Sequence, residues 1–102
     1  MNNTSEKLLV IDVAPKMDRF DEVIKYFAKL SAIFEAFGAT RIQKLRTREQ
    51  LMGDTAVKAT AIVNFPDAEA IKNVFSSAEF AALENAHEIL YETFSLRICD
   101  GH

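Results

Sequence analysis

The stretch FPDAEAIKNVFSSAEF, residues 65–80, decides how this chain folds. Phe65 closes an apolar run, and Pro66 ends it because proline has no N–H to donate to a strand ladder. Asp67 stands where a helix N-cap is expected, since its carboxylate can accept from the first free N–H groups of a helix. The next apolar residues recur at helical spacing: Ala70, Ile71, Val74 and Phe75. A strand therefore ends here and a short amphipathic helix begins.

The serine pair at positions 76 and 77 ends this helix and starts a second helical piece. Ser77 is a suitable N-cap, and Glu79 in the first turn matches the positive end of the helix dipole. The predicted buried stripe of this piece is Phe80, Leu83, Ala86 or His87, and Leu90. Residues 93–99 then alternate, which predicts a last strand. Its core-facing residues are Phe94, Leu96 and Ile98.

Upstream, residues 8–13 (LLVIDV) form an apolar run that is too short for a helix. This run predicts a central strand buried on both faces and ended by Pro15. Asp18 is the predicted N-cap of the next helix, and Gly38 is its C-terminal glycine. The apolar stripe of this helix is Phe20, Val23, Ile24, Phe27, Leu30, Phe34 and Phe37.

Residues 40–52 and 56–65 form a predicted hairpin about the turn Gly53-Asp54. The first of these strands alternates poorly and is highly charged, which is typical of a sheet edge. Its basic residues are Arg41, Lys44, Arg46 and Arg48. They indicate either charge that protects an edge strand from pairing with other chains or a patch that binds anions or nucleic acid.

The resulting order is β-α-β-β-α-β, with the second helix in two pieces. Right-handed crossovers allow essentially one compact α+β arrangement of such a chain. It is a four-stranded antiparallel sheet in the order 4-1-3-2, with the helices on one face. Residues 1–102 are expected to form a single domain, with residues 1–6 and 100–102 flexible.

Composition narrows the class of protein. The chain has 12 basic and 15 acidic residues, a net charge of -3, which argues against binding nucleic acid through its phosphates. It carries no apolar stretch of membrane-spanning length and no signal-peptide pattern, so no membrane partner is expected. The lone Cys99 fits a reducing compartment, here the cytoplasm. With only His87 and His102 as histidines and no phosphate-binding motif, we expect neither a metal nor a cofactor.

The sheet face away from the helices mixes apolar and polar side chains. Its apolar residues are Leu8, Val10, Leu45 and Ile62, and its main polar residues are Asp12, Thr60, Asn64 and Arg97. Such a face is too apolar for open water and too polar for a sealed core, which predicts a homodimer packed sheet to sheet. The polar set would either fix the register of the dimer or orient a polar ligand. The alternative is a mixed face that stays solvated.

Two segments carry a family resemblance. Residues 65–80 resemble, without a gap, the segment of the DUF1330 family that usually reads F-P-s-x-E-A-a-x-x-F/W-Y-x-S-p-E-Y. Residues 26–39 (YFAKLSAIFEAFGA) are similar to the tyrosine-led helix of that family, which ends in Gly-Gly. Ala39, Val74 and Ala78 depart from the family pattern. The resemblance implies a ferredoxin-like subunit of the dimeric α/β-barrel superfamily, which pairs through its sheet. Relatives there include cofactor-free monooxygenases, isomerases and effector-sensing domains.

The sequence supports two functional hypotheses. The first is that a small, mostly apolar organic molecule binds in the cleft between sheet and helices, with cofactor-free catalysis of the monooxygenase or isomerase type left open. The candidate ligand contacts are Tyr26, Phe27, Phe75 and Phe80. His87 and Tyr91 are the candidate proton carriers. In the alternative, the aromatic residues fill this space as core, and the protein is a non-catalytic sensing or assembly module that works through its dimer interface.

Overall fold

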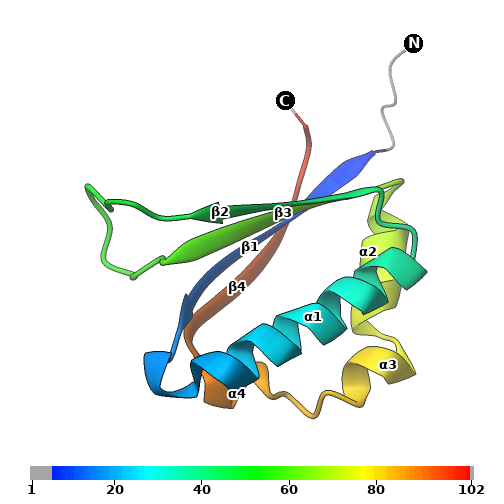
Figure 1. Cartoon of the computed structure of the whole chain (residues 1–102). Helices are drawn as coiled ribbons and strands as arrows, with labels where there is room; N and C mark the ends of the chain where they lie inside the picture. Colours follow the sequence, from blue (N-terminus) through cyan, green and yellow to red (C-terminus); the bar gives the residue numbers. More distant parts are fainter. Residues whose placement is uncertain (1–5, 102) are drawn as a thin grey trace.

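A computed structural model of the chain describes residues 6–101 as a sheet with one layer of helices against it (Figure 1). The strands are β1 (Lys7–Pro15), β2 (Arg41–Arg46), β3 (Ala59–Phe65) and β4 (Tyr91–Cys99). The helices are η1 (a 3₁₀ turn, Met17–Arg19), α1 (Phe20–Ala36), α2 (Ala68–Phe75), α3 (Ala78–Ala81) and α4 (His87–Leu90). No helix within residues 6–101 is long and apolar enough to span a membrane.

The sheet confirms the predicted topology. The strand order is β2-β3-β1-β4, which is 4-1-3-2 viewed from the other edge, and the paired strands are antiparallel. The apolar strand β1 lies centrally, between β3 and β4. Ile11 pairs with Ala61 on one side and with Leu96 on the other, so these three side chains share the face that the helices cover.

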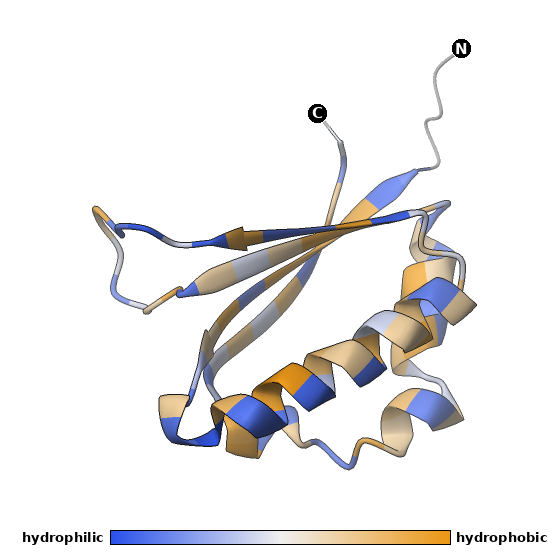
Figure 2. Ribbon diagram, in the orientation of Figure 1, coloured by the Kyte–Doolittle hydropathy of each residue, from blue (hydrophilic) through white to orange (hydrophobic). Residues whose placement is uncertain are grey.

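The core lies between that face and helices α1 and α2. Its most deeply buried side chains are Leu9, Ile11, Leu30, Phe34, Val63, Phe65, Ile71 and Val74. Hydrophobic and hydrophilic residues alternate along helix α1 (Figure 2), and Val23, Tyr26, Leu30 and Phe34 are its buried residues. The predicted stripe of α1 needs two corrections: Phe20 and Ile24 are 45% and 53% exposed, and Tyr26 is buried although it is not predicted to be. Tyr26 turns inward because its ring packs edge-on against Tyr91 and Phe94, with centroids 6.0 and 6.2 Å away.

The start of α1 also differs from the prediction. Asp18 lies within η1, and no side chain caps α1, whose N-cap position is Arg19. The Arg19 N–H instead bonds the Lys16 carbonyl at 3.0 Å, so a 3₁₀ turn satisfies the backbone that a cap would otherwise serve.

Both predicted caps of the 65–80 stretch are present. The Asp67 carboxylate accepts from the Ala70 N–H at 2.8 Å, and the Ser77 hydroxyl accepts from the Phe80 N–H at 3.1 Å. Gly38 adopts φ +104°, as a C-terminal glycine should, and its α-carbon lies beside Pro66. Helix α2 thus begins and α1 ends next to the same proline.

Replacing Asp67 with alanine is expected to lower the free energy of unfolding by about 1 kcal/mol, because the Ala70 N–H loses its partner. Asp67→Asn keeps an accepting oxygen and should recover most of the loss. Urea unfolding of the three proteins measures this. An Asn variant as unstable as the Ala variant would show that the cap bond is not the cause.

The segment after α3 is not the continuous helix that the sequence predicts. The sequence predicts a continuous stripe from Phe80 to Leu90, but Glu84 and Asn85 adopt left-handed φ values of 56° and 57° and separate α3 from α4. Two such residues in succession cannot continue a right-handed helix. The break lets α4 lead directly into β4 at Tyr91.

The hairpin strands are shorter than predicted. Residues 47–58 leave the ladder as a projecting arm, at the left of Figure 1. Gln50 organises this arm: its side-chain amide donates to the Thr55 carbonyl at 2.8 Å and accepts from the Val57 N–H at 2.9 Å. These bonds lie beyond the last backbone bond between the two segments, from the Thr47 N–H to the Lys58 carbonyl at 2.9 Å.

Most residues of the ends that are predicted to be flexible, 1–5 and 102, lie outside the described residues. Of the neighbouring residues, Lys7 and Asp100 form an ion pair at 2.9 Å, and Glu6 accepts from the Asn64 amide at 3.3 Å.

Candidate ligand cavity

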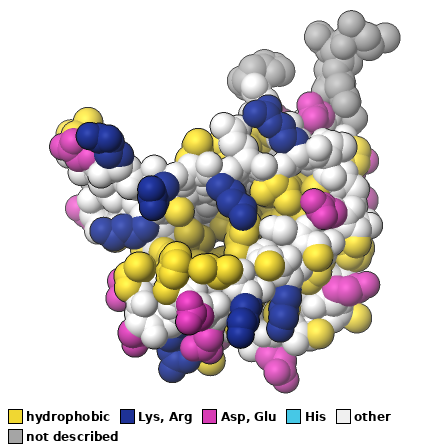
Figure 3. All heavy atoms as spheres, in the orientation of Figure 1, with side chains coloured by type: hydrophobic (Ala, Val, Ile, Leu, Met, Phe, Trp, Pro, Cys, Tyr) yellow, Lys and Arg dark blue, Asp and Glu magenta, His cyan; other side chains and the backbone are white. Residues whose placement is uncertain are grey.

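An apolar hollow of about 180 Å³ lies between the sheet and the first half of α1, and we call it the α1 cavity. Strands β1 and β3 form its floor with Ile11, Val13, Ala59 and Ala61. Helix α1 forms its roof with Phe20, Val23 and Phe27. Pro15 and Tyr91 close one end, and Lys44 lies at the open side. Figure 3 shows a hollow between sheet and helix, with hydrophobic walls and basic side chains along its sheet-side rim.

The cavity exists because two floor positions carry small side chains. Ala59 and Ala61 alternate with Thr60 along β3, so both methyl groups point toward α1. The next floor positions along the same strand, Val63 and Phe65, are larger and completely buried. Along β3, space is therefore left only near Ala59 and Ala61, beneath the first half of α1. Pro15 and Tyr91 are cross-strand partners at an irregularity in the β1–β4 register, and together they close that end.

Tyr91 is a cavity residue that can donate a hydrogen bond. Burial raises the pKa of Tyr91 to about 12, and the nearby Tyr26 contributes to the same rise. Burial likewise raises the pKa of Tyr26 to about 12. Both phenols therefore stay protonated at neutral pH, so Tyr91 can donate a hydrogen bond, whereas its raised pKa makes release of its proton less favourable. The Tyr26 hydroxyl is buried without a hydrogen-bonding partner among residues 6–101.

His87 is the other predicted proton carrier, and it lies beside the cavity wall rather than in it. It packs on Phe94, with ring centroids 4.9 Å apart, and Phe94 packs in turn on Tyr91 at 5.0 Å. His87 is not among the side chains that line the α1 cavity. Its Nδ1 is buried and has no partner within the described part of the chain.

The four predicted ligand contacts separate into two places. Phe27 lines the α1 cavity, and Tyr26 packs in the neighbouring aromatic cluster. Phe75 and Phe80 lie at the other end of the helix layer, where they contact each other edge-on at 4.9 Å. Phe75 also contacts the buried Phe34 at 6.4 Å. The predicted contacts therefore do not share one cleft: Phe27 lines the α1 cavity, and Phe75 lines a separate groove beside α2.

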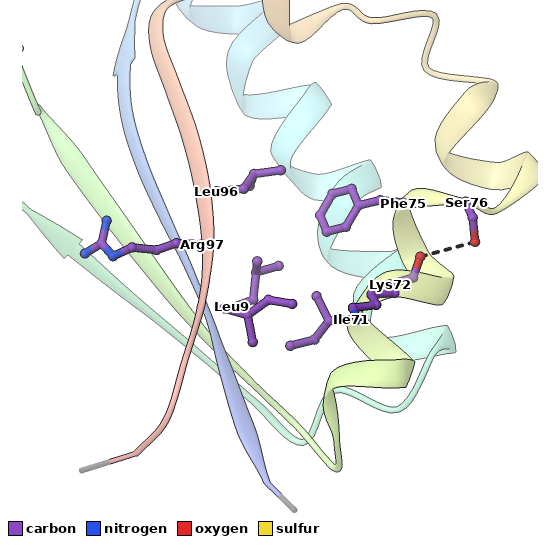
Figure 4. A pocket seen from close by; sticks show the side chains of 8 residues that line it. Leu9, Ile71, Lys72, Phe75, Ser76, Leu96 and Arg97 are labelled. Carbon is purple, nitrogen blue, oxygen red and sulfur yellow. Dashed lines mark hydrogen bonds between the residues drawn. The ribbon is translucent and has the colours of Figure 1, made fainter.

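A second hollow, the β4–α2 groove, runs between α2 and the β4 edge, with a volume of about 460 Å³. In Figure 4, Leu9 and Leu96 point toward Ile71 and Phe75, whereas Arg97 points to the other side of the sheet. Leu96 and Ile98 remain 39% and 42% exposed because α2 does not reach over β4. The groove is larger than the α1 cavity, but it is open along β4, and the guanidinium of Arg97 points away from it. The α1 cavity is less open and more uniformly apolar, and it is therefore the better candidate site for a small molecule.

On the outer sheet face, the predicted polar set forms a bonded network. Asp12 accepts from Arg97 and, at 2.8 Å, from the Thr60 hydroxyl, while Asn64 bonds Glu6. Partial burial alone would raise the pKa of Asp12. The hydrogen bonds from Arg97 and Thr60 and the charge of Arg97 outweigh that effect and hold the pKa below its ordinary value. The four predicted residues thus take part in three hydrogen bonds on this face, two at Asp12 and one at Asn64.

This network predicts a pH dependence. A carboxylate with a lowered folded-state pKa stabilises the fold above its unfolded value of about 4 and loses that contribution as the pH falls further. Asp12→Asn should therefore be less stable than the wild type at pH 7, and the difference should shrink as the pH falls below about 4. The same change at Asp54, on the exposed arm, is the control. If the difference in unfolding free energy between Asp12→Asn and the wild type stays constant across this pH range, the lowered pKa of Asp12 is not its cause.

Sequence reasoning missed three residues that define the cavity. The alternation of β3 marks Ala59 and Ala61 only as ordinary inner-face core, and the charge of β2 groups Lys44 with the other basic residues of an edge strand. Lys44 instead reaches across the opening, where its Nζ lies 4.9 Å from the centre of the Phe27 ring. Within residues 6–101 no group of three or more His, Cys, Asp or Glu side chains is arranged to hold a metal ion.

Comparison with known proteins agrees with this architecture. Residues 8–101 match the family described as "Domain of unknown function (DUF1330)". SnoaB, a cofactor-independent oxygenase from Streptomyces nogalater, superposes with a TM-score of 0.69 at 22% identity, over 96% of this chain and 94% of that one. A DABB family protein with a ferredoxin-like fold, from Mesorhizobium loti, gives 0.68 at 15% identity, over 92% and 94%. An EthD family protein from Bacillus halodurans gives 0.65 at 19% identity, over 96% and 99%. At these identities the likeness establishes the ferredoxin-like fold alone. No curated protein matches the sequence significantly.

Proposed function

This chain belongs to the DUF1330 family, and from that premise we propose that it binds a small, mostly apolar organic molecule in the α1 cavity. The observation that carries the proposal is a hollow, open on one side, with an apolar floor and roof. Lys44 and Tyr91 bring polar groups to its lining, whereas the hydroxyl of Thr60 bonds Asp12 on the outer sheet face. Cavities of this character bind organic ligands through burial of apolar surface, and a few polar groups orient them.

The volume sets the size of the ligand. An apolar protein cavity of about 150 Å³ is enough to hold benzene. The α1 cavity, at about 180 Å³, fits one ring or a short branched chain, and larger ligands would extend out past Lys44.

We further propose that the protein acts as a homodimer in the cytoplasm and that residues 1–102 form one DUF1330-like domain. The mixed outer face of the sheet supports the dimer, because the helices leave it uncovered while the half-buried Ile62 and the exposed Leu45 lie on it. The single cysteine, Cys99, supports a reducing compartment. A face-to-face dimer also matches the type of subunit to which the chain is similar.

Native mass spectrometry of freshly purified, untagged protein tests binding and assembly together. We expect twice the subunit mass together with a small retained adduct that is displaced by added aromatic probes. A dimer that carries no adduct and takes up no probe would contradict the binding proposal. A monomer at micromolar concentration would contradict the dimer.

We also propose a more specific function, catalysis without a cofactor. The oxygenase SnoaB, which has a similar fold, is described as cofactor-independent and supports this proposal. Tyr91 is the residue placed to assist it, because it lines the cavity as a protonated phenol. If the retained molecule is converted on incubation, Tyr91→Phe should slow the conversion by about 100-fold, the lower range for loss of one hydrogen-bond donor to a developing negative charge. His87→Ala, outside the cavity, is the matched control. Unchanged conversion by Tyr91→Phe would remove Tyr91 from the chemistry.

One observation favours the second candidate, a non-catalytic sensing or assembly module. Phe34, Phe75 and Phe80 contact one another edge-on at the α2 end of the layer, so the predicted ligand contacts among them are engaged in packing between aromatic rings. In a module the remaining hollow would be a packing defect, and the outer sheet face would be the working surface. A dimer that persists when the cavity is filled by mutation, with no probe bound by the wild type, would favour this alternative.

A further inference from the structure

Two cations of strand β2 stand beside the floor of the α1 cavity. In the β2–β3 register Lys44 pairs with Ala61 and Arg46 pairs with Ala59, so each basic side chain starts next to one of the two small floor residues. Directly opposed residues on neighbouring antiparallel strands have Cβ atoms about 5 Å apart and share one face of the sheet. Both side chains therefore leave β2 on the side of the cavity.

Lys44 crosses the opening of the cavity. It lines the hollow together with Phe27 on the opposite wall, and its Nζ lies over the Phe27 ring. A contact with a ring face uses none of the three N–H donors in a directed hydrogen bond. The ammonium thus remains able to donate to a ligand that occupies the space beneath it.

Neither cation has a carboxylate partner among residues 6–101. The ion pairs in this part of the chain join Lys7 to Asp100, Arg19 to Glu22 and Arg97 to Asp12. An uncompensated ammonium beside apolar walls attracts an anion more strongly than one in open water, because the walls lower the local dielectric. The opening of the cavity is therefore a favourable place for one negative charge.

We propose that the ligand of the α1 cavity is a small organic acid, an apolar ring or short chain that carries one carboxylate. Its apolar part lies on Ala59 and Ala61, and its carboxylate pairs with Lys44, with Arg46 as a second, outer cation. This inference rests on the proposed function and specifies its ligand class. The competing explanation is that Lys44 and Arg46 only keep the edge strand β2 from pairing with other chains.

Benzoate and benzyl alcohol separate these explanations, because they share a ring and differ in charge. Each is titrated into the intact protein, followed by NMR, at concentrations that cover the millimolar affinities usual for fragments of this size. The variants are Lys44→Met, which keeps the length and apolar stem, Lys44→Arg, which keeps the charge, and Lys72→Met, which removes a lysine from the β4–α2 groove.

We expect wild type and Lys72→Met to bind benzoate at least 10-fold more tightly than benzyl alcohol. Lys44→Met should lose this preference and bind both probes as the wild type binds benzyl alcohol, and Lys44→Arg should retain most of it. The preference should also weaken with added salt.

Three results would overturn the inference. Equal binding of both probes to the wild type would remove the preference for acids and leave the small-molecule proposal standing. Loss of both probes in Lys44→Met would assign the effect to the shape of the stem and not to its charge. Binding of neither probe to the wild type would remove the inference together with the proposed function.

Discussion

Replacing Ala61 with leucine is expected to abolish binding of benzoate and benzyl alcohol while leaving the fold at least as stable as the wild type. Ala61 is buried on the cavity floor, opposite the roof residues Val23 and Phe27. A leucine there places additional carbon atoms in the hollow that the ligand would occupy. We expect affinity for either probe to fall by about 100-fold or more, the free-energy equivalent of about 3 kcal/mol.

Stability is the second readout of this variant, and it distinguishes a true cavity from a well-packed core. Filling a void commonly raises the free energy of unfolding by about 0.5–2 kcal/mol. Forcing the same atoms into a packed core lowers it by about 1–3 kcal/mol. Ala32→Leu, on the exposed side of α1, is the matched control and should change neither binding nor stability appreciably. An Ala61→Leu protein that is destabilised, or that binds the probes as before, would contradict the α1 cavity.

Leu45→Glu is expected to convert the proposed homodimer into a monomer. Leu45 is 45% exposed in the single chain, so glutamate is tolerated by the subunit itself. It pairs with Thr60, whose side chain bonds Asp12, and so Leu45 lies on the outer sheet face. In a two-fold dimer the change would place two carboxylates in the interface, each with a desolvation penalty of several kcal/mol. The dissociation constant should therefore rise by about 100-fold or more.

Ile24→Glu is the control for this experiment. Ile24 is also a large apolar residue and is 53% exposed, but it lies on α1, on the opposite layer. Sedimentation equilibrium should find Ile24→Glu dimeric and Leu45→Glu monomeric. If Ile24→Glu dissociates and Leu45→Glu does not, the subunits pair through the helices and the sheet-face dimer is wrong.

The topology could be predicted from the sequence because several independent local signals agreed. Pro66, Asp67 and Ser77 mark where a strand ends and two helices begin, and each acts through its own backbone and near neighbours. The apolar run of β1 then leaves it only a central place, and the handedness of crossovers fixes the rest. Such signals depend little on the remainder of the fold.

The errors lie where tertiary contacts decide. Tyr26 replaced Ile24 in the buried stripe because Tyr91 and Phe94, far along the chain, offer it a packing surface. Gln50 bonds the backbone of the arm that starts at residue 47, which no alternation pattern reveals. Glu84 and Asn85 break the helix without a glycine or proline to signal it.

The cavity could be predicted only in part. Phe27 and Tyr91 are candidates from the sequence and do line it, whereas Phe75 and Phe80 pack elsewhere. A hollow forms where no side chain fills the space. The sequence shows that Ala59 and Ala61 are small residues on an inner strand face, but it does not show whether a residue of α1 fills the space above them. Lys44 acquires its position from the pairing of β2 with β3 and from the ring of Phe27 on another element.

Methyl NMR on the intact wild-type protein tests the central claim, that the α1 cavity binds a small organic molecule. Ile11 and Val23 line that cavity, whereas Ile71 and Ile98 line the β4–α2 groove, so their methyl groups report the two hollows separately. On titration with benzyl alcohol, a neutral probe, we predict saturable shifts at Ile11 and Val23 and none at Ile71 and Ile98. Saturable shifts confined to Ile71 and Ile98, or no saturable shift at any of the four, would contradict it.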